Sequence, residues 1–107
     1  MPEITVLVYK AANGREPFRD WADSLDKTAA QAVAARINRL MSGNFGDWKA
    51  VGDGVYELRI QYGAGYRVYF GRDDRTMVIL LNGGSKRSQA ADIRQAIRNW
   101  RDYVQRK

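Results

Sequence analysis

The segment YELRIQYGAGYRVYFGRDD, residues 56–74, predicts a β-hairpin whose register constrains the rest of the fold. Polar and apolar residues alternate on both sides of a glycine-rich turn, which is typical of two strands that each bury one face. If the hairpin is symmetric about Gly63, Arg59 lies directly across from Arg67. Like charges at opposite positions weaken a sheet, so stability alone does not explain this arginine pair.

The alternation divides the hairpin into two faces. One face is apolar, and we expect a pair of helices to cover it. The other face is polar and carries Glu57, Arg59, Arg67 and Tyr69. The next segment, GGSKRS at 83–88, is expected to be a flexible basic loop that brings Lys86 and Arg87 to the rim of this polar face.

The remaining segments predict the other elements. Residues 4–9 and 76–82 are rich in β-branched and apolar side chains and indicate strands, with a short edge strand around 48–51. Pro17 suits the start of a first helix, and Asp26 and Ser88 are candidate caps of two further helices. The order is β-α-α-β-β-β-α. We expect one compact α+β domain over residues 1–107, in which a helical hairpin packs on an antiparallel-rich sheet and a C-terminal helix follows.

The composition excludes several classes of site. The 107 residues include no Cys and no His, which removes disulfides, thiolate metal sites and the commonest general base. No dense acidic cluster is expected on the polar face, so we expect no metal and no cofactor. The N-terminal segment lacks the pattern of a signal peptide, and no apolar run approaches the roughly 18–20 residues of a membrane span. A cytoplasmic location is the default expectation.

The charge of the chain favours a polyanionic partner. There are 18 Lys and Arg against 12 Asp and Glu, a net charge of +6. The excess lies toward the C-terminus, because residues 86–107 hold seven basic and two acidic side chains. Nucleic acid is the first candidate partner for such a domain, and a merely solubilising surface is the alternative.

The polar face suggests what that partner would contact. Several cations on one surface repel one another unless an anion lies between them, and arginine can bind a phosphodiester through two hydrogen bonds. Tyr69 would add a ring for base stacking. In the structural alternative, Arg59 pairs with Glu57 and Arg67 covers the sheet with its stem. The phosphate hypothesis requires that both arginines share a face and are not neutralised by buried carboxylates.

Four segments together resemble a known family. GVYELRI, GYRVYF, VILLNGGSKRSQ and the last helix are similar to the RelE/ParE superfamily of bacterial toxins, and more narrowly to its HigB-like addiction module killer branch. The resemblance covers nearly the whole chain. It implies a toxin of a type II toxin–antitoxin module, with a cognate antitoxin encoded adjacently and operator DNA bound only through the antitoxin complex. RelE-like members cleave mRNA on the ribosome, whereas ParE-like members poison DNA gyrase.

The resemblance also implies site residues. Functional cations of RelE-like toxins lie on the sheet and near the loop after the last strand. Arg67 matches such a position well, and Arg59 and Lys86 match less closely. An aromatic residue near the C-terminus often contributes, and Tyr103 is the candidate here, with helix packing as the alternative. Some HigB toxins use histidines, and that scheme does not transfer to this chain.

RNA can be cut without histidine, because its own 2′-hydroxyl can attack the phosphate. In this hypothesis Arg67 and Arg59 stabilise the charge that grows on the phosphate oxygens. Lys86 acts as acid or base, since neighbouring cations favour its neutral form, and Glu57 is an alternative base. The rival interpretations are a ParE-like gyrase poison without nuclease activity and a non-catalytic RNA-binding protein or decayed toxin.

Overall fold

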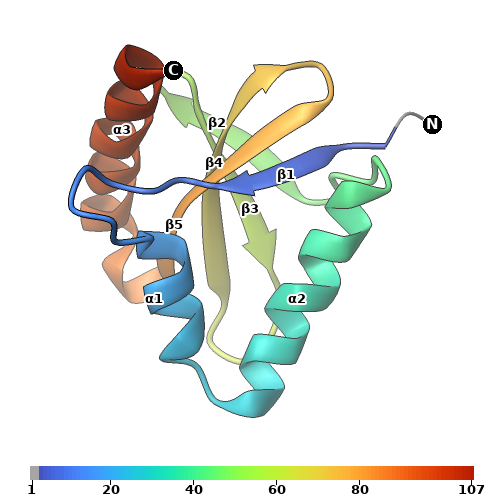
Figure 1. Cartoon of the computed structure of the whole chain (residues 1–107). Helices are drawn as coiled ribbons and strands as arrows, with labels where there is room; N and C mark the ends of the chain where they lie inside the picture. Colours follow the sequence, from blue (N-terminus) through green and yellow to red (C-terminus); the bar gives the residue numbers. More distant parts are fainter. Residues whose placement is uncertain (1–2) are drawn as a thin grey trace.

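The computed structural model describes residues 3–107 and shows one twisted sheet with helices on both of its faces (Figure 1). The strands are β1 (Thr5–Val8), β2 (Trp48–Gly52), β3 (Val55–Ile60), β4 (Tyr66–Asp74) and β5 (Met77–Ser85). They lie in the order β1-β5-β4-β3-β2. Strand β1 is parallel to β5, and every other pairing is antiparallel. The predicted α+β class and antiparallel-rich sheet are confirmed, and β2 is the expected edge strand.

The helices are α1 (Pro17–Asp23), α2 (Lys27–Met41) and α3 (Gln89–Arg106), with a short 3₁₀ turn, η1 (Lys86–Ser88), before α3. Pro17 begins α1 as predicted. Asp26 caps α2, because its Oδ1 accepts a hydrogen bond from the Ala29 amide at 2.9 Å. Ser88 precedes α3 but does not cap it with its side chain, since its hydroxyl donates to Asp92 instead.

The helical hairpin of α1 and α2 covers one face of the sheet (Figure 1). On this face the apolar side chains of the β3–β4 hairpin, with Leu58 and Phe70 at its centre, pack against Val33 and Leu40 of α2. The predicted pairing of apolar hairpin face and helical hairpin is confirmed. Within α2, Met41 is 43% exposed, whereas Arg36 is buried although it is charged.

The C-terminal helix α3 covers the opposite face of the sheet (Figure 1). Beneath it lies a second core that includes Tyr69, Ile79 and Leu81. The helix approaches closely because β4 carries a glycine: a Cβ on Gly71 would overlap the ring of Trp100. Helix α3 therefore covers part of the polar face of the hairpin. The part near the turn, which contains Arg59 and Arg67, is open to solvent.

Strand β5 is longer than the sequence predicts. Residues 83–85 continue the strand, and 86–88 form η1, so the expected flexible loop at 83–88 is wrong. The two glycines serve close packing: the ring of Trp21 lies against Gly83, and the carboxylate of Asp92 lies against Gly84. Among the helices formed by residues 3–107, none has the length and apolar character needed to cross a membrane.

Candidate functional site

Arg59 and Arg67 are direct cross-strand partners between β3 and β4, as the symmetric turn predicts. Both side chains lie on the face that α3 begins to cover, and they are 34% and 13% exposed. The turn that sets this register needs glycines, because Gly63 and Gly65 have φ angles of +57° and +93°, in the left-handed region. The predicted pair therefore exists and opens toward solvent at one edge.

The carboxylate of Glu57 explains how two arginines tolerate each other. Glu57 is fully buried, and its Oε1 lies 3.2 Å from Arg59 Nε while its Oε2 lies 3.7 Å from Arg67 Nε. Gln89, the first residue of α3, donates a third contact from its Nε2 to Oε2 at 2.8 Å. One negative charge between two positive ones reduces their repulsion and fixes their positions.

A buried carboxylate does contact both arginines, so the condition that none neutralises them is met only in part. Glu57 supplies one negative charge against two guanidinium groups, and Asp47 lies 3.8 Å from Arg59 Nη1 at the surface. Arg67 Nε finds no hydrogen-bond partner among the described residues. This nitrogen is buried and faces the carboxylate of Glu57 at 3.7 Å, so an ionic contact without a hydrogen bond holds it there.

The arginines open into a depression of about 430 Å³ at the tip of the hairpin, here called the arginine depression. Lys86 lies on its rim, and the Lys86 amide is held there by the carbonyl of Gly65 at 3.3 Å. Arg87 is exposed on η1 but does not line the depression. The lining comprises Asp47, Arg59, Ile60, Gln61, Gly63, Ala64, Gly65, Arg67 and Lys86.

Tyr69 does not offer a surface for base stacking. Its side chain is fully buried in the second core, so with α3 in place no base can reach its ring. Burial raises the pKa of its phenol, and the negative charge of Glu57 adds to this effect. The alternation of the strand placed Tyr69 on the correct face, but it could not show that α3 covers that position.

Tyr103 lies away from the arginine depression. It follows Gln89 by 14 positions in α3, which at about 1.5 Å per residue places it roughly 21 Å farther along the helix. Its hydroxyl donates to Asp73 Oδ2 at 2.8 Å, and its ring stacks on Trp100 with centroids 5.4 Å apart. The structure therefore supports the helix-packing alternative for Tyr103.

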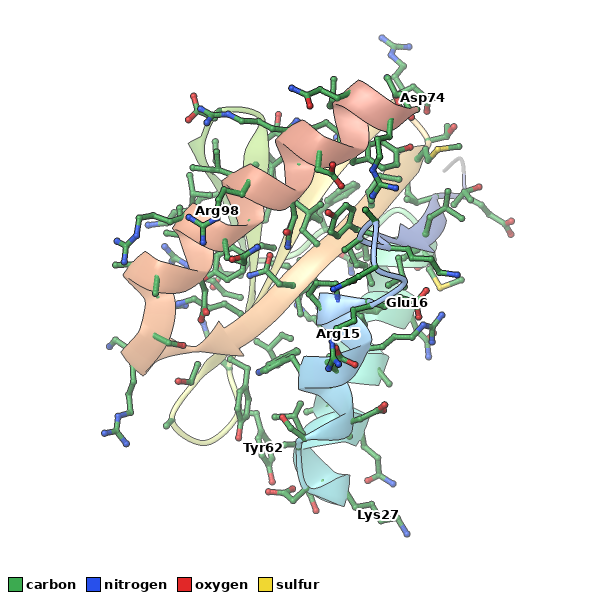
Figure 2. The ribbon with its side chains drawn as sticks, turned by 60° about the vertical axis from the view of Figure 1, so that its left-hand side comes forward. Arg15, Glu16, Lys27, Tyr62, Asp74 and Arg98 are labelled. Atoms are coloured by element: carbon green, nitrogen blue, oxygen red, sulfur yellow. The ribbon has the colours of Figure 1, made fainter. Side chains whose placement is uncertain are left out.

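Tyr62, which the sequence pattern does not single out, is an aromatic residue in the loop between β3 and β4 (Figure 2). Tyr62 is 37% exposed, and its ring stacks on Tyr66 with centroids 6.3 Å apart and planes 18° apart. The available signal was its position next to the turn glycines, where a side chain is seldom covered.

No group of three or more acidic side chains within residues 3–107 is arranged to hold a metal ion.

The family follows from comparison with known proteins. Residues 20–100 match the model of a family described as phage derived protein Gp49-like (DUF891). The chain belongs to the Gp49-like family. The matched range contains both arginines, Glu57 and Lys86, and it stops before Tyr103. An uncharacterized protein of Haemophilus influenzae is 51% identical over 80 residues, which cover 74% of this chain and 81% of the relative.

The Gp49-like family is of the RelE/HigB toxin type. The resemblance to this toxin superfamily is therefore confirmed at the coarse level. The narrower assignment to a HigB-like branch stays a prediction, and so do the roles of the individual site residues.

Proposed function

We propose that this Gp49-like protein is the toxin of a type II toxin–antitoxin module and a ribosome-dependent, metal-independent endoribonuclease that cleaves mRNA and so inhibits translation. The observation that supports the proposal is the arginine depression, where Arg59, Arg67 and Lys86 converge at one end of the sheet. Three cations around a hollow of this size suit a phosphodiester, since guanidinium groups hold phosphate oxygens in a defined geometry.

The chemistry uses the nucleophile that RNA itself supplies. The 2′-hydroxyl attacks the adjacent phosphorus, the bond to the 5′-oxygen of the next nucleotide breaks, and a 2′,3′-cyclic phosphate results. Arg59 and Arg67 stabilise the charge that develops on the phosphate oxygens. Because Glu57 fixes both Nε atoms from below, the arginines are positioned before substrate arrives, which reduces the reorganisation needed during reaction.

The proton transfers are assigned by exposure. Glu57 is fully buried and bound to Arg59 and Gln89, so it holds the arginines in position and does not reach the substrate. Lys86 is exposed on the rim of the depression and is the candidate acid for the leaving 5′-oxygen or base for the 2′-hydroxyl. The ribosome presents the message and restrains its backbone.

The same basic surface suits the proposed antitoxin. We infer that an acidic or amphipathic segment of the antitoxin, encoded next to the toxin, covers Arg59 and Arg67 or moves Lys86 out of place. Either action would exclude the phosphate. Operator DNA would be bound through the antitoxin in the complex, not through the arginine depression.

A ribosome-dependent cleavage assay with Arg67→Ala tests the proposal. Removal of one transition-state donor should lower the cleavage rate about 10²- to 10³-fold with retained folding, and growth inhibition should be lost. Arg75→Ala is a matched control, because Arg75 is an exposed arginine in the turn at the opposite end of β4. A message with a 2′-deoxy nucleotide at the cut position should resist the wild type, and equal cleavage of that message would refute the mechanism.

Labelling of cells with radioactive precursors separates the rival functions. A nuclease stops incorporation into protein first, whereas a gyrase poison stops DNA replication first and induces the DNA-damage response. Expression without any effect on either process would favour the non-catalytic alternative.

A further inference from the structure

A second depression, here called the helix depression, adjoins the arginine depression. It has a volume of about 360 Å³ and lies between α2 and the end of β3. Arg59 and Asp47 line both depressions, so the two adjoin around the tip of the hairpin and are here together called the groove. On the α2 side the lining includes Arg36, Arg39 and Tyr62.

Arg36 adds a buried positive charge to the helix depression. Its side chain is only 6% exposed, and Nη2 and Nε donate to backbone carbonyls, including that of Phe45 at 2.6 Å and that of Arg59 at 3.3 Å. Nη1 has no partner, and no carboxylate of residues 3–107 lies within ion-pair distance of Arg36. Burial lowers the pKa of this guanidinium and the charge of Arg39 lowers it further, whereas the charge of Asp47 acts in the opposite direction.

Arg39 lies one turn farther along the same face of α2 and is exposed to solvent. It makes no ion pair within the described part of the chain. A buried guanidinium beside a second, exposed cation is an unfavourable arrangement in the free protein, and the carboxylate of Asp47 in the same lining offsets it only in part. An anion bound beside Arg39 would offset this unfavourable energy.

Tyr62 supplies the complementary aromatic surface. Its exposed ring lines the helix depression and is supported from behind by Tyr66. A positively charged groove with an exposed aromatic ring is the combination by which proteins bind single-stranded nucleic acid, because phosphates contact the cations and bases stack on the ring.

We propose that the helix depression binds the nucleotide next to the cleaved linkage, with Arg39 contacting its phosphate, Tyr62 stacking on its base and Arg36 adding positive potential from the interior. This inference rests on the proposed function, in which the arginine depression holds the scissile phosphate. It assigns Arg39 and Tyr62 to binding and not to the chemical step.

Binding of a fluorescent single-stranded RNA in the absence of ribosomes tests this assignment. Tyr62→Ala should weaken RNA binding about tenfold, the order expected for loss of one stacked base. Arg39→Ala should also weaken binding and should lower the slope of log affinity against log salt by about 0.7, the value for one phosphate of a single strand. Arg75→Ala, far from the groove, should change neither. Both test residues are exposed, so their removal should leave folding intact.

Inorganic polyphosphate serves as a base-free probe. Arg39→Ala should weaken its binding, whereas Tyr62→Ala should not. The inference is overturned if wild type does not bind the RNA, or if Arg39→Ala and Tyr62→Ala both behave like Arg75→Ala while Arg67→Ala loses binding. That second result would leave the proposed nuclease intact. The opposite combination is also informative. If both variants lose RNA binding as expected but the wild type does not cleave mRNA on the ribosome, the nucleotide-binding role of the groove is supported and the nuclease function is refuted.

Discussion

The side-chain amide of Gln89 donates a hydrogen bond to Glu57 Oε2 at 2.8 Å, which ties the first residue of α3 to the middle of the sheet. The same carboxylate lies 3.2 Å from Arg59 Nε and 3.7 Å from Arg67 Nε. The docking of the C-terminal helix and the placement of both arginines therefore depend on one buried side chain.

Glu57→Gln should impair both folding and activity. The substitution keeps the shape of the side chain but removes the negative charge between two guanidinium groups. We expect the free energy of unfolding to fall by about 2 kcal/mol, less than the ~3–5 kcal/mol of a fully buried broken pair, because Arg59 is one-third exposed. Unfolding in guanidinium chloride would measure the loss of stability, and the ribosome-dependent cleavage assay would measure the loss of activity.

Gln89→Ala is the graded comparison, since it removes one neutral donor and leaves the ionic contacts. A loss of about 1.5 kcal/mol is expected for it, the lower end of the range for a hydrogen bond to a charged group. A Glu57→Gln variant as stable as wild type would show that the carboxylate is not needed to hold the arginines.

Arg36→Met should destabilise the connection between α2 and β2. The methionine fills similar space but leaves the carbonyls of Phe45 and Asp47 without their charged donor. The expected loss is about 2 kcal/mol in the free energy of unfolding. Arg39→Met, one turn away and exposed, should change this free energy by less than about 0.5 kcal/mol. Equal stability of the two variants would contradict the structural role of Arg36.

Gly71→Ala should displace α3 from the sheet. The added methyl group would overlap the ring of Trp100, and overpacking of this kind typically costs about 1–3 kcal/mol. The effect should be smaller in a Trp100→Leu background, where the ring is absent. A double-mutant cycle by thermal or denaturant unfolding measures the coupling, and strictly additive changes would show that the two residues are not in contact.

The end of α3 should weaken in acid. The hydrogen bond from Arg106 lowers the pKa of Asp102 below its ordinary value of 3.8, and the hydrogen bond from Tyr9 lowers it further. A lowered pKa adds stability that is present above the unfolded-state value and is lost as the pH falls through the folded-state value. We therefore expect the free energy of unfolding to decrease as the pH is lowered below about 4.

Asp102→Asn should reduce stability at neutral pH. It should also make the acid limb, which is the loss of stability below about pH 4, less steep. The acid limb should not vanish, because Lys107 and Tyr103 lower the pKa of Asp73 in the same way. Unfolding curves at several pH values would measure both slopes, and an unchanged acid limb in Asp102→Asn would exclude this residue as a source.

The register of the hairpin could be predicted from sequence because two local rules agree. Alternation assigned each side chain of β3 and β4 to a face, and the turn glycines fixed the opposition of Arg59 and Arg67. The position of Glu57 on the same face followed from the same alternation. These features depend on residues that are close in the sequence, and the sequence pattern is most informative about such residues.

The remaining features depend on contacts between distant segments. Alternation does not say which helix covers which face, so the burial of Tyr69 under α3 was not predictable. The glycine pair predicts a loop, whereas Gly83 and Gly84 are strand positions against which Trp21 and Asp92 pack. The exposure of Tyr62 likewise depends on how closely α2 approaches the hairpin tip, because the two leave the helix depression between them.

The triple contact of Glu57 also has a genetic consequence. Mutants selected for escape from growth inhibition should fall into two groups that protein abundance distinguishes. Changes at Glu57 should yield little accumulated protein, since folding suffers together with activity. Changes at Lys86, whose side chain is exposed on the rim, should leave abundant, well-folded and harmless protein that the antitoxin still captures.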